Sequence, residues 1–501
     1  MPPLRDTADT GRGINAGLNQ DAPISRLPPE ILSKIFICYA QTTKGATVGW
    51  PALTHICHYW REVALASPLL WTKIHVSNHP NTEPVASYIE RSAEMPLSVR
   101  VRVETEPYTD SIHMILPELR RARKLHIMAL IPILELLETH LQPSAPLLKS
   151  LVIFKTDVKF DFKLSIFNNC RMPALDRLSL IYVPLEWSTV VFPPSLTDLH
   201  IEAGRWYSSE LNTSITDMVR VIQGLPLLKR LALSHVLKPV ENGETEPILP
   251  VSLCQLEFIR INAPVSTCLR LLDHLTFPPS TALVCQFMGN IDPSLLGPLR
   301  SRLQALLAAN RIDYISISTS VEFVARSSEP SSPDRLCFSL SMEGNILEGL
   351  FTHIPLPDVS ELVVERAINT SDTKTEWIQL SQRLPNVDTL MFRSISPDAL
   401  CLLAPIIPPE QSTGEPFYLF PKLRRVLLES LDSQGRSWSH SSDLHGEEPF
   451  IAALRSRKAR GCGIKTVEVK QCSSICAEDI KVAEVYVDVK WDGIMKTVED
   501  N

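Results

Sequence analysis

The N-terminal part of the chain has apolar residues at helical spacing. The pattern opens with Leu27-Pro28-Pro29-Glu30, where proline suits a first helical turn and the carboxylate faces the helix dipole. Five apolar residues then recur every three or four positions: Ile31, Leu32, Ile35, Phe36 and Tyr39. This spacing predicts a helix that ends near Ala40, and Gly45, Gly49 and Pro51 mark a break after it.

A second helical pattern follows the break. Its apolar residues fall on one face of a helix: Leu53, Ile56, Cys57, Trp60, Val63 and Ala64. Pro68 ends the pattern and Trp71 supplies a large apolar side chain. We therefore expect residues 23–75 to form a compact helical module. A module of this size is near the lower limit of independent stability, so its surplus apolar faces need a partner or the following segment.

The pattern changes to strands after residue 96. Residues 97–104 alternate strictly between apolar and polar types, which predicts a half-buried strand. Beyond them, a phrase of the form Leu-x-x-Leu-x-Leu returns at intervals of 20–50 residues, which indicates a repeat architecture. The clearest copies start at Leu148, Leu175, Leu196, Leu228, Leu253, Val359, Val387, Leu423 and Ile464.

The spacing of the repeats leaves room for one strand and one returning helix in each. The central residues Leu151, Leu178, Leu199, Leu231 and Leu256 are 27, 21, 32 and 25 residues apart. Segments 216–223, 298–309 and 449–459 are predicted to be helical. The expected fold is α/β, with the helical module followed by a curved solenoid with a parallel sheet; an ordinary leucine-rich α/β domain is the alternative. We expect five segments: a loose tail (1–22), the module (23–75), a connecting strand region (76–115), the solenoid (116–495) and a tail (496–501).

Composition narrows the classes of function. The formal net charge is −7, which argues against general nucleic-acid binding. Eleven cysteines without a C-x-x-C pair favour reduced thiols inside a cell. No apolar run opens the chain, and the longest apolar stretch, 127–137, is too short to span a membrane. We expect a cytoplasmic or nuclear protein that binds neither nucleic acid nor membrane.

Motifs that could carry chemistry are weak. The glycines of 11–17 do not follow a strand, and the Ser, His and Asp residues of 437–445 lie in one polar run without a nucleophile elbow. His55, Cys57 and His58 could ligate zinc, but they point to different sides of the expected helix. The basic runs 120–124 and 455–460 are either import or anion patches or ordinary charged helix ends. We expect no catalytic residue, metal or cofactor.

The first module resembles an F-box. The resemblance rests on Leu27-Pro28-Pro29-Glu30-Ile31-Leu32-x-x-Ile35-Phe36, on Ile56-Cys57-x-x-Trp60-Arg61-Glu62-Val63-Ala64 and on Ser67-Pro68-Leu69-Leu70-Trp71. It is similar in particular to fungal F-box-like proteins with degenerate leucine-rich repeats. The resemblance implies a non-enzymatic substrate receptor of a ubiquitin ligase, in which the F-box docks on a Skp-type adaptor and through it on a cullin. The residues that match adaptor-facing or core positions of the motif are Leu27, Pro28, Ile31, Ile35, Phe36, Ile56 and Trp60.

The repeats would then hold the target protein. They lack the asparagine of regular leucine-rich repeats, since Thr156, Val183, Gly204 and Val236 occupy that position. Residues flanking each central leucine are expected on the open sheet face, where they would contact the target. These include Arg177, Ser179, His200, Arg230, Gln255, Glu257, Met391, Arg425 and Glu468. Two alternatives are an adaptor-independent repeat scaffold, whose helical module caps the solenoid, and an enzyme hidden in the array.

Overall fold

The chain divides into two compact units. A computed structural model describes residues 23–42, 49–77, 82–104, 110–157, 163–204, 211–239, 249–288, 292–308, 312–318, 322–327, 335–341, 356–365, 374–394, 400, 402–406, 417–431, 449–472, 475 and 477–494. Unit 1 comprises residues 1–213 and 220–228, and unit 2 comprises residues 214–219 and 229–501. The expected tails, the glycines of 11–17 and the polar run 437–445 lie outside the described residues. The expected segment bounds stay predictions.

Unit 1 begins with a helical module. Its elements are η1 (Pro23–Arg26), α2 (Pro29–Thr42), η2 (Trp50–His55), α3 (His58–Leu65) and η3 (Pro68–Trp71). The first helix thus forms where the sequence predicts it. The second predicted helix is wrong as a continuous element, because the chain is extended at Cys57, with φ −154° and ψ 168°. The Sγ atom of Cys57 accepts a hydrogen bond from the Trp60 amide at 3.5 Å, which caps α3 at its start.

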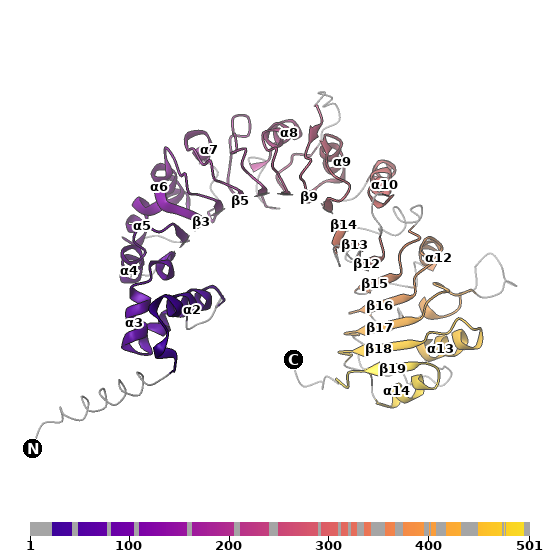
Figure 1. Ribbon diagram of the computed structural model, residues 1–501. Helices are drawn as coiled ribbons and strands as arrows, with labels where there is room; N and C mark the ends of the chain where they lie inside the picture. Colours follow the sequence, from indigo (N-terminus) through magenta and orange to yellow (C-terminus); the bar gives the residue numbers. More distant parts are fainter. Residues whose placement is uncertain are drawn as a thin grey trace, which may run out of the picture. The chain divides into compact units, whose positions relative to one another are not determined.

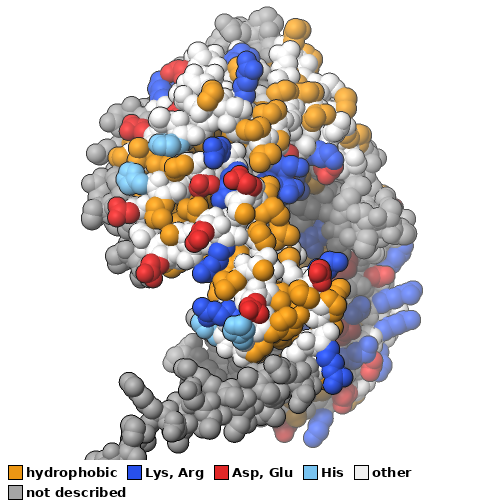
Figure 2. Space-filling model, turned by 60° about the vertical axis from the view of Figure 1, so that its left-hand side comes forward, with side chains coloured by type: hydrophobic (Ala, Val, Ile, Leu, Met, Phe, Trp, Pro, Cys, Tyr) orange, Lys and Arg blue, Asp and Glu red, His pale blue; other side chains and the backbone are white. Residues whose placement is uncertain are grey.

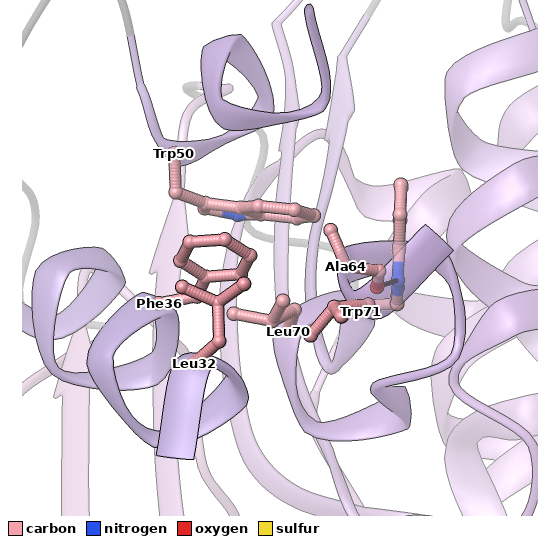
Figure 3. Packing of buried hydrophobic residues seen from close by; sticks show 7 residues of the cluster. Leu32, Phe36, Trp50, Ala64, Leu70 and Trp71 are labelled. Atoms are coloured by element: carbon pink, nitrogen blue, oxygen red, sulfur yellow. Dashed lines mark hydrogen bonds between the residues drawn. The ribbon is translucent and has the colours of Figure 1, made fainter. Parts of the chain in front are cut away.

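Aromatic side chains fill the core of this module. Trp50 lies across Phe36, with Leu32 and Leu70 below (Figure 3). The rings of Trp50 and Trp71 meet edge to face with centroids 4.8 Å apart. The indole of Trp71 also donates a hydrogen bond to the carbonyl of Ala64 at 2.9 Å, so a buried polar group is satisfied. The tryptophan at the end of the module therefore acts as the apolar plug expected from the sequence.

The rest of unit 1 is an α/β repeat. Its described strands pair in chain order and in parallel: β1 (Lys73–Ser77), β2 (Leu97–Val103), β3 (Ala122–Ala129), β4 (Ser150–Lys155), β5 (Arg177–Ile181) and β6 (Asp198–Glu202). The helices α4 (Glu83–Arg91), α5 (Asp110–Ile115), α6 (Ile131–Leu141) and α7 (Ile166–Asn169) lie on one side of these strands (Figure 1).

The register of the strands explains the leucine phrase. Ile74, Val99, Leu125, Leu151, Leu178 and Leu199 stand in one row across the six strands, each at most 2% exposed. The last apolar residue of each phrase, two positions after the central one, forms a second row parallel to the first. Each buried side chain of this size contributes roughly 1.5–3 kcal/mol, so the rows hold successive repeats together. The opposite face of the same strands carries the alternate, exposed or half-buried residues.

Unit 2 continues the same architecture with one departure. Its main sheet has the strand order β7 (Arg230–Ser234), β9 (Phe258–Ala263), β11 (Ala282–Phe287), β14 (Arg335–Ser341), β13 (Glu322–Ser327), β12 (Tyr314–Ser318), β15 (Glu361–Glu365), β16 (Thr389–Arg393), β17 (Arg425–Glu429), β18 (Thr466–Lys470) and β19 (Asp488–Trp491). Strand β13 runs antiparallel to β12 and β14. The other described pairs of this sheet are parallel, as the sequence predicts, and β13 is the departure.

Helices connect the strands of unit 2. They are α9 (Val265–Asp273), α10 (Pro293–Ala308), α12 (Lys374–Arg383), α13 (Pro449–Ala459) and α14 (Ala477–Glu484); α8 (Ile215–Gln223) is shared between the units, and a small sheet pairs β8 (Val251–Ser252) with β10 (Leu275–Thr276). Helices α8 and α13 match the predicted segments. Helix α10 starts five residues before the predicted start at Pro298, which lies inside the helix. The helix begins earlier because Asp292 accepts a hydrogen bond from the Ser294 amide.

One repeat is displaced from its predicted register. Strand β9 pairs Ile259, and not Leu256, with Leu231 of β7. Leu253 and Leu256 form a turn, in which the Leu256 amide donates to the Leu253 carbonyl at 3.1 Å. Both side chains are buried, but they lie before the strand and not in it. Leu225 and Leu228 occupy the same positions one repeat earlier. The true phrase is thus Leu256-x-x-Ile259-x-Ile261, three residues later than predicted.

Several of the described turns that end the strands have a residue other than asparagine in the left-handed conformation. Tyr182, His235, Ser394, Ser430 and Gln471 each follow a strand with φ between 51° and 59°, the left-handed region. The amides of the first four donate to a carbonyl of the neighbouring strand at 2.7–3.0 Å. At the asparagine position of the β18 repeat, the Cys472 thiol donates a hydrogen bond to the Leu428 carbonyl at 3.5 Å.

No helix of the described part is long and apolar enough to cross a membrane.

Candidate protein-interaction surfaces

Helix α2 presents apolar side chains on two faces. Leu32 and Phe36, four residues apart, point into the core and are nearly inaccessible to solvent. Ile31 and Ile35 are each 43% exposed and Tyr39 is 41% exposed, again at a spacing of four. We call Ile31, Ile35 and Tyr39 the apolar stripe. Contiguous exposed apolar side chains of this kind mark interaction surfaces in folded proteins.

The N-terminal end of the apolar stripe is extended by neighbouring residues. Pro28 is exposed, and Ile24, the second residue of the short η1 helix, is also exposed. Ile56, 53% exposed, stands just before α3, whose Tyr59 hydroxyl donates to the Leu27 carbonyl at 2.7 Å. That bond places the start of α3 beside the start of α2. Figure 2 shows hydrophobic side chains side by side in the lower part of the face, where this module lies.

The predicted adaptor residues therefore separate into two groups. Pro28, Ile31, Ile35 and Ile56 are exposed. Phe36 is buried, Leu27 and Trp60 are half-buried, and the Trp60 ring packs on Phe36 with centroids 5.1 Å apart. The sequence pattern missed Tyr39 and Ile24 as surface residues, although the spacing of Tyr39 from Ile35 carries the signal. The polar residues Glu30, Lys34, Arg61 and Glu62 are exposed around the stripe, as in the rim of an interface.

The possible zinc ligands of this module do not converge. The His55 side chain is exposed, His58 lies 3.6 Å from Glu62, and the thiol of Cys57 caps α3. Within the described ranges no group of three or more His, Cys, Asp or Glu residues could hold a metal ion.

Three predicted target residues lie on the open sheet face of unit 1. Arg177 and Ser179 lie on β5, in register with Asp198 and His200 of β6. The Ser179 hydroxyl is 3.0 Å from the Nδ1 atom of His200, and Arg177 is exposed, 3.8 Å from the Asp176 carboxylate. These residues form a polar part of the face that a polypeptide could contact by hydrogen bonds.

The other predicted target residues belong to unit 2. Arg425 donates to the Glu468 carboxylate at 2.7 Å, across β17 and β18. Burial alone would raise the pKa of Glu468, but the hydrogen bond from Arg425 and the nearby charges of Arg425, Lys470 and Lys490 hold it below its usual value. Met391 is half-buried, and its sulfur accepts a hydrogen bond from Arg393.

Of the three remaining predicted residues of unit 2, Arg230 lies on its strand and two do not. Arg230 is exposed on β7, with its guanidinium 4.6 Å from the centre of the Phe258 ring. Gln255 and Glu257 were expected on a strand but precede β9, because the repeat register is shifted. Glu257 instead pairs with Lys229 at 3.4 Å. Phe258 and Arg260 occupy the strand positions expected for Gln255 and Glu257.

Each basic run contributes one buried arginine. Arg121 donates to the Glu118 carboxylate and to the Met95 carbonyl, at 2.6 and 2.8 Å. Arg457 is completely buried and donates to the carbonyls of Leu403 and Leu419, at 2.8 and 2.6 Å. Both arginines therefore have a structural role.

Comparisons with known proteins add little to this description. The sequence matches no family model, and no curated protein matches it significantly. Among solved structures, the chain is similar to the crystal structure of a Rad7 and Elc1 complex in yeast. The TM-score is 0.34, with 11% identity, covering 79% of this chain and 94% of that chain. A TM-score this low carries no argument, so the α/β repeat assignment rests on the strand register.

Proposed function

We propose that this chain is the substrate-recognition subunit of a Skp–cullin–F-box ubiquitin ligase. In this proposal residues 23–75 are an F-box that docks on a Skp-type adaptor and, through it, on a cullin. The two repeat units bind a target protein, and the chain itself catalyses no step. The observation that supports this proposal most strongly is the exposed apolar stripe on a module whose core is already filled and whose sequence resembles an F-box.

The packing of α2 supports a docking role. The core of the module is already filled by Leu32, Phe36, Trp50 and Trp71, so the stripe cannot be explained as part of it. Burial of Ile31 and Ile35 against a partner would gain on the order of 1 kcal/mol each. An apolar centre with charged residues around it is the usual composition of a specific interface.

The open sheet faces support target binding. In unit 1 the described strand side chains on that face are exposed or half-buried; in unit 2 most are, with Val363, Leu427 and Glu468 among the buried exceptions. The accessible side chains carry hydrogen-bonding groups and charges of both signs. They stand on a rigid framework, because the other face of each strand is packed in buried rows. Such faces bind extended surfaces of other proteins in repeat proteins generally.

An adaptor-independent scaffold is the second candidate. Aromatic contacts join the module to the first repeat helix: the rings of Trp71 and Tyr88 are 5.0 Å apart, and the guanidinium of Arg91 lies 4.4 Å from the Trp71 ring. The module could therefore serve as a cap for the repeats of unit 1. In that case, deletion of residues 1–75 would leave the remainder insoluble.

Gel filtration of the full chain with a recombinant fungal Skp-type adaptor and a cullin N-terminal domain tests the proposal. We expect the chain to enter a ternary complex and to need the adaptor for association with the cullin. If the folded chain elutes apart from the adaptor, the ligase proposal fails and the scaffold remains.

A further inference from the structure

The open face of β1–β3 carries basic side chains in register. Arg100 on β2 pairs with His75 of β1 on one side and with His126 of β3 on the other. Neighbouring strands are about 4.8 Å apart, so the three side chains stand in one row on the same face. His75 and Arg100 are exposed and His126 is half-buried. We call His75, Arg100 and His126 the basic row.

More positive charge surrounds the basic row than negative charge. Lys73 and Lys124 stand in the adjacent row, both in register with Ser98, and Arg102 stands on the other side of Arg100. Glu104 faces this region but already pairs with Arg102 at 2.8 Å. The corresponding face of β4 adds only Ser150, Val152 and Phe154. Among the described residues, no carboxylate forms an ion pair with Lys73, Arg100 or Lys124.

Sheet stability does not explain this arrangement. Like charges on adjacent strand positions repel one another and destabilise a sheet. Burial, and then the charges of Arg100 and Lys73, lower the pKa of His75; burial, and then the charge of Arg100, lower the pKa of His126. Both imidazoles are therefore neutral near neutral pH, and a bound anion would reverse that balance by favouring their protonated forms.

We propose that the basic row binds an anionic side-chain group on an extended segment of the target protein. Phosphorylated serine or threonine and clustered carboxylates share this chemistry. The Arg100 guanidinium supplies a fork of donors to the anion, and His75 and His126 donate from either side. The inference rests on the proposed receptor function, whose target it describes.

The size and surroundings of the basic row favour a polypeptide over a nucleic acid. Three strands span only about 10 Å, whereas duplex binding usually engages about 6–10 phosphates. The next strand positions are apolar, since Met128 pairs with Phe154 and His126 with Val152. A peptide segment with one anionic group followed by apolar side chains fits both parts of this face.

Binding of three short peptides to the full chain, without adaptor, tests the inference. The probes are Ala-Val-X-Val-Ala peptides in which X is phosphoserine, glutamate or serine, with affinity measured by fluorescence anisotropy. We expect the phosphoserine peptide, or both anionic peptides, to bind more tightly than the serine peptide. The comparison of phosphoserine with glutamate identifies the source of the anion. Equal affinity for all three peptides, or no binding by any, overturns the inference.

Two variants with matched charge change locate the site. Arg100→Gln should weaken the anionic peptide at least about tenfold, because it removes a charge-assisted hydrogen-bond donor. Lys163→Gln removes an exposed positive charge elsewhere in unit 1, where Lys163 pairs with Glu186, and should change affinity less than about twofold. Since Arg100 is exposed, the variant should keep the circular dichroism and melting temperature of the wild type. Equal affinity of wild type and Arg100→Gln contradicts the proposal.

The pH dependence supplies a readout that general charge attraction does not. The pKa values of His75 and His126 are lowered from the ordinary value of 6.5, so both imidazoles gain protons as pH falls from about 7 to about 6. Affinity should therefore rise as pH falls across this range, and the rise should disappear in the double variant His75→Gln/His126→Gln.

A short DNA duplex tests the choice of a polypeptide over a nucleic acid. If the duplex binds more tightly than every peptide, and if this binding depends on Arg100, the polypeptide assignment is overturned. Failure of these tests in a chain that still binds the adaptor would leave the receptor proposal standing.

Discussion

The Tyr59 hydroxyl donates a hydrogen bond of 2.7 Å to the backbone carbonyl of Leu27. This bond joins the start of α3 to a residue two positions before α2, and so fixes one end of the apolar stripe. Tyr59→Phe removes the bond while keeping the ring, and should lower the local unfolding free energy by about 1 kcal/mol. Hydrogen exchange of the α2 amides measures the effect. Unchanged exchange in α2 would show that the bond does not hold this end of the module.

Neighbouring residues of α2 should differ in their effect on stability. Phe36→Ala opens a cavity between Trp50 and Trp60 and should cost about 3–5 kcal/mol. Ile35→Ala changes an exposed side chain and should cost less than about 1 kcal/mol. Urea unfolding followed by tryptophan fluorescence compares the two variants. Similar losses for both would contradict the assignment of Phe36 to the core and Ile35 to the surface.

Cysteine reactivity should follow burial. Burial raises the pKa of Cys285 to about 12 and places that of Cys268 well above its ordinary value, whereas Cys38 and Cys254 are exposed. Because the thiolate is the reactive form, both buried thiols stay protonated and unreactive near pH 8. Iodoacetamide labelling of the native chain, read by mass spectrometry, should modify Cys38 and Cys254 before Cys268 and Cys285. Equally fast labelling of Cys285 would contradict the packing of β11 against α9.

Arg457 should be the most sensitive position of the second basic run. Its guanidinium satisfies the carbonyls of Leu403 and Leu419 and lies 4.9 Å from the Tyr418 ring centre. Burial lowers the pKa of Arg457 to about 10, so it keeps its charge at neutral pH. Arg457→Met leaves buried acceptors without donors and should destabilise unit 2 by about 3 kcal/mol. Its exposed neighbour supplies the control, because Arg455→Met should be nearly neutral in the same urea titration.

The sequence predicted the elements whose apolar spacing is local. Helix α2, strand β2 and eight of the nine predicted repeat strands follow from residues three, four or two positions apart, where periodicity is strong. The displaced strand β9 shows the limit of this reasoning. Leu253, Leu256, Ile259 and Ile261 fit the phrase in two registers, and only pairing with Leu231 selects one.

Other features depend on contacts that spacing does not reveal. The break at Cys57 follows from a cap between its thiol and the Trp60 amide. The antiparallel strand β13 depends on pairing with both neighbours, and its sequence carries no sign of direction. The candidate surface on α2 was predicted as a mixed set of core and surface residues. Burial separated them, because Leu32 and Phe36 fill the module and leave Ile31, Ile35 and Tyr39 outside.

The affinity of the full chain for a Skp-type adaptor, measured by calorimetry, tests the central claim most directly. Wild type should bind, and Ile31→Asp/Ile35→Asp should lose at least about a hundredfold in affinity, because docking would bury unpaired carboxylates. Val191→Asp is the matched control, since Val191 is an apolar residue of unit 1 that is 65% exposed away from the module. It should bind as wild type does. Absence of binding by the wild type, or undiminished binding by the folded double variant, would contradict the account.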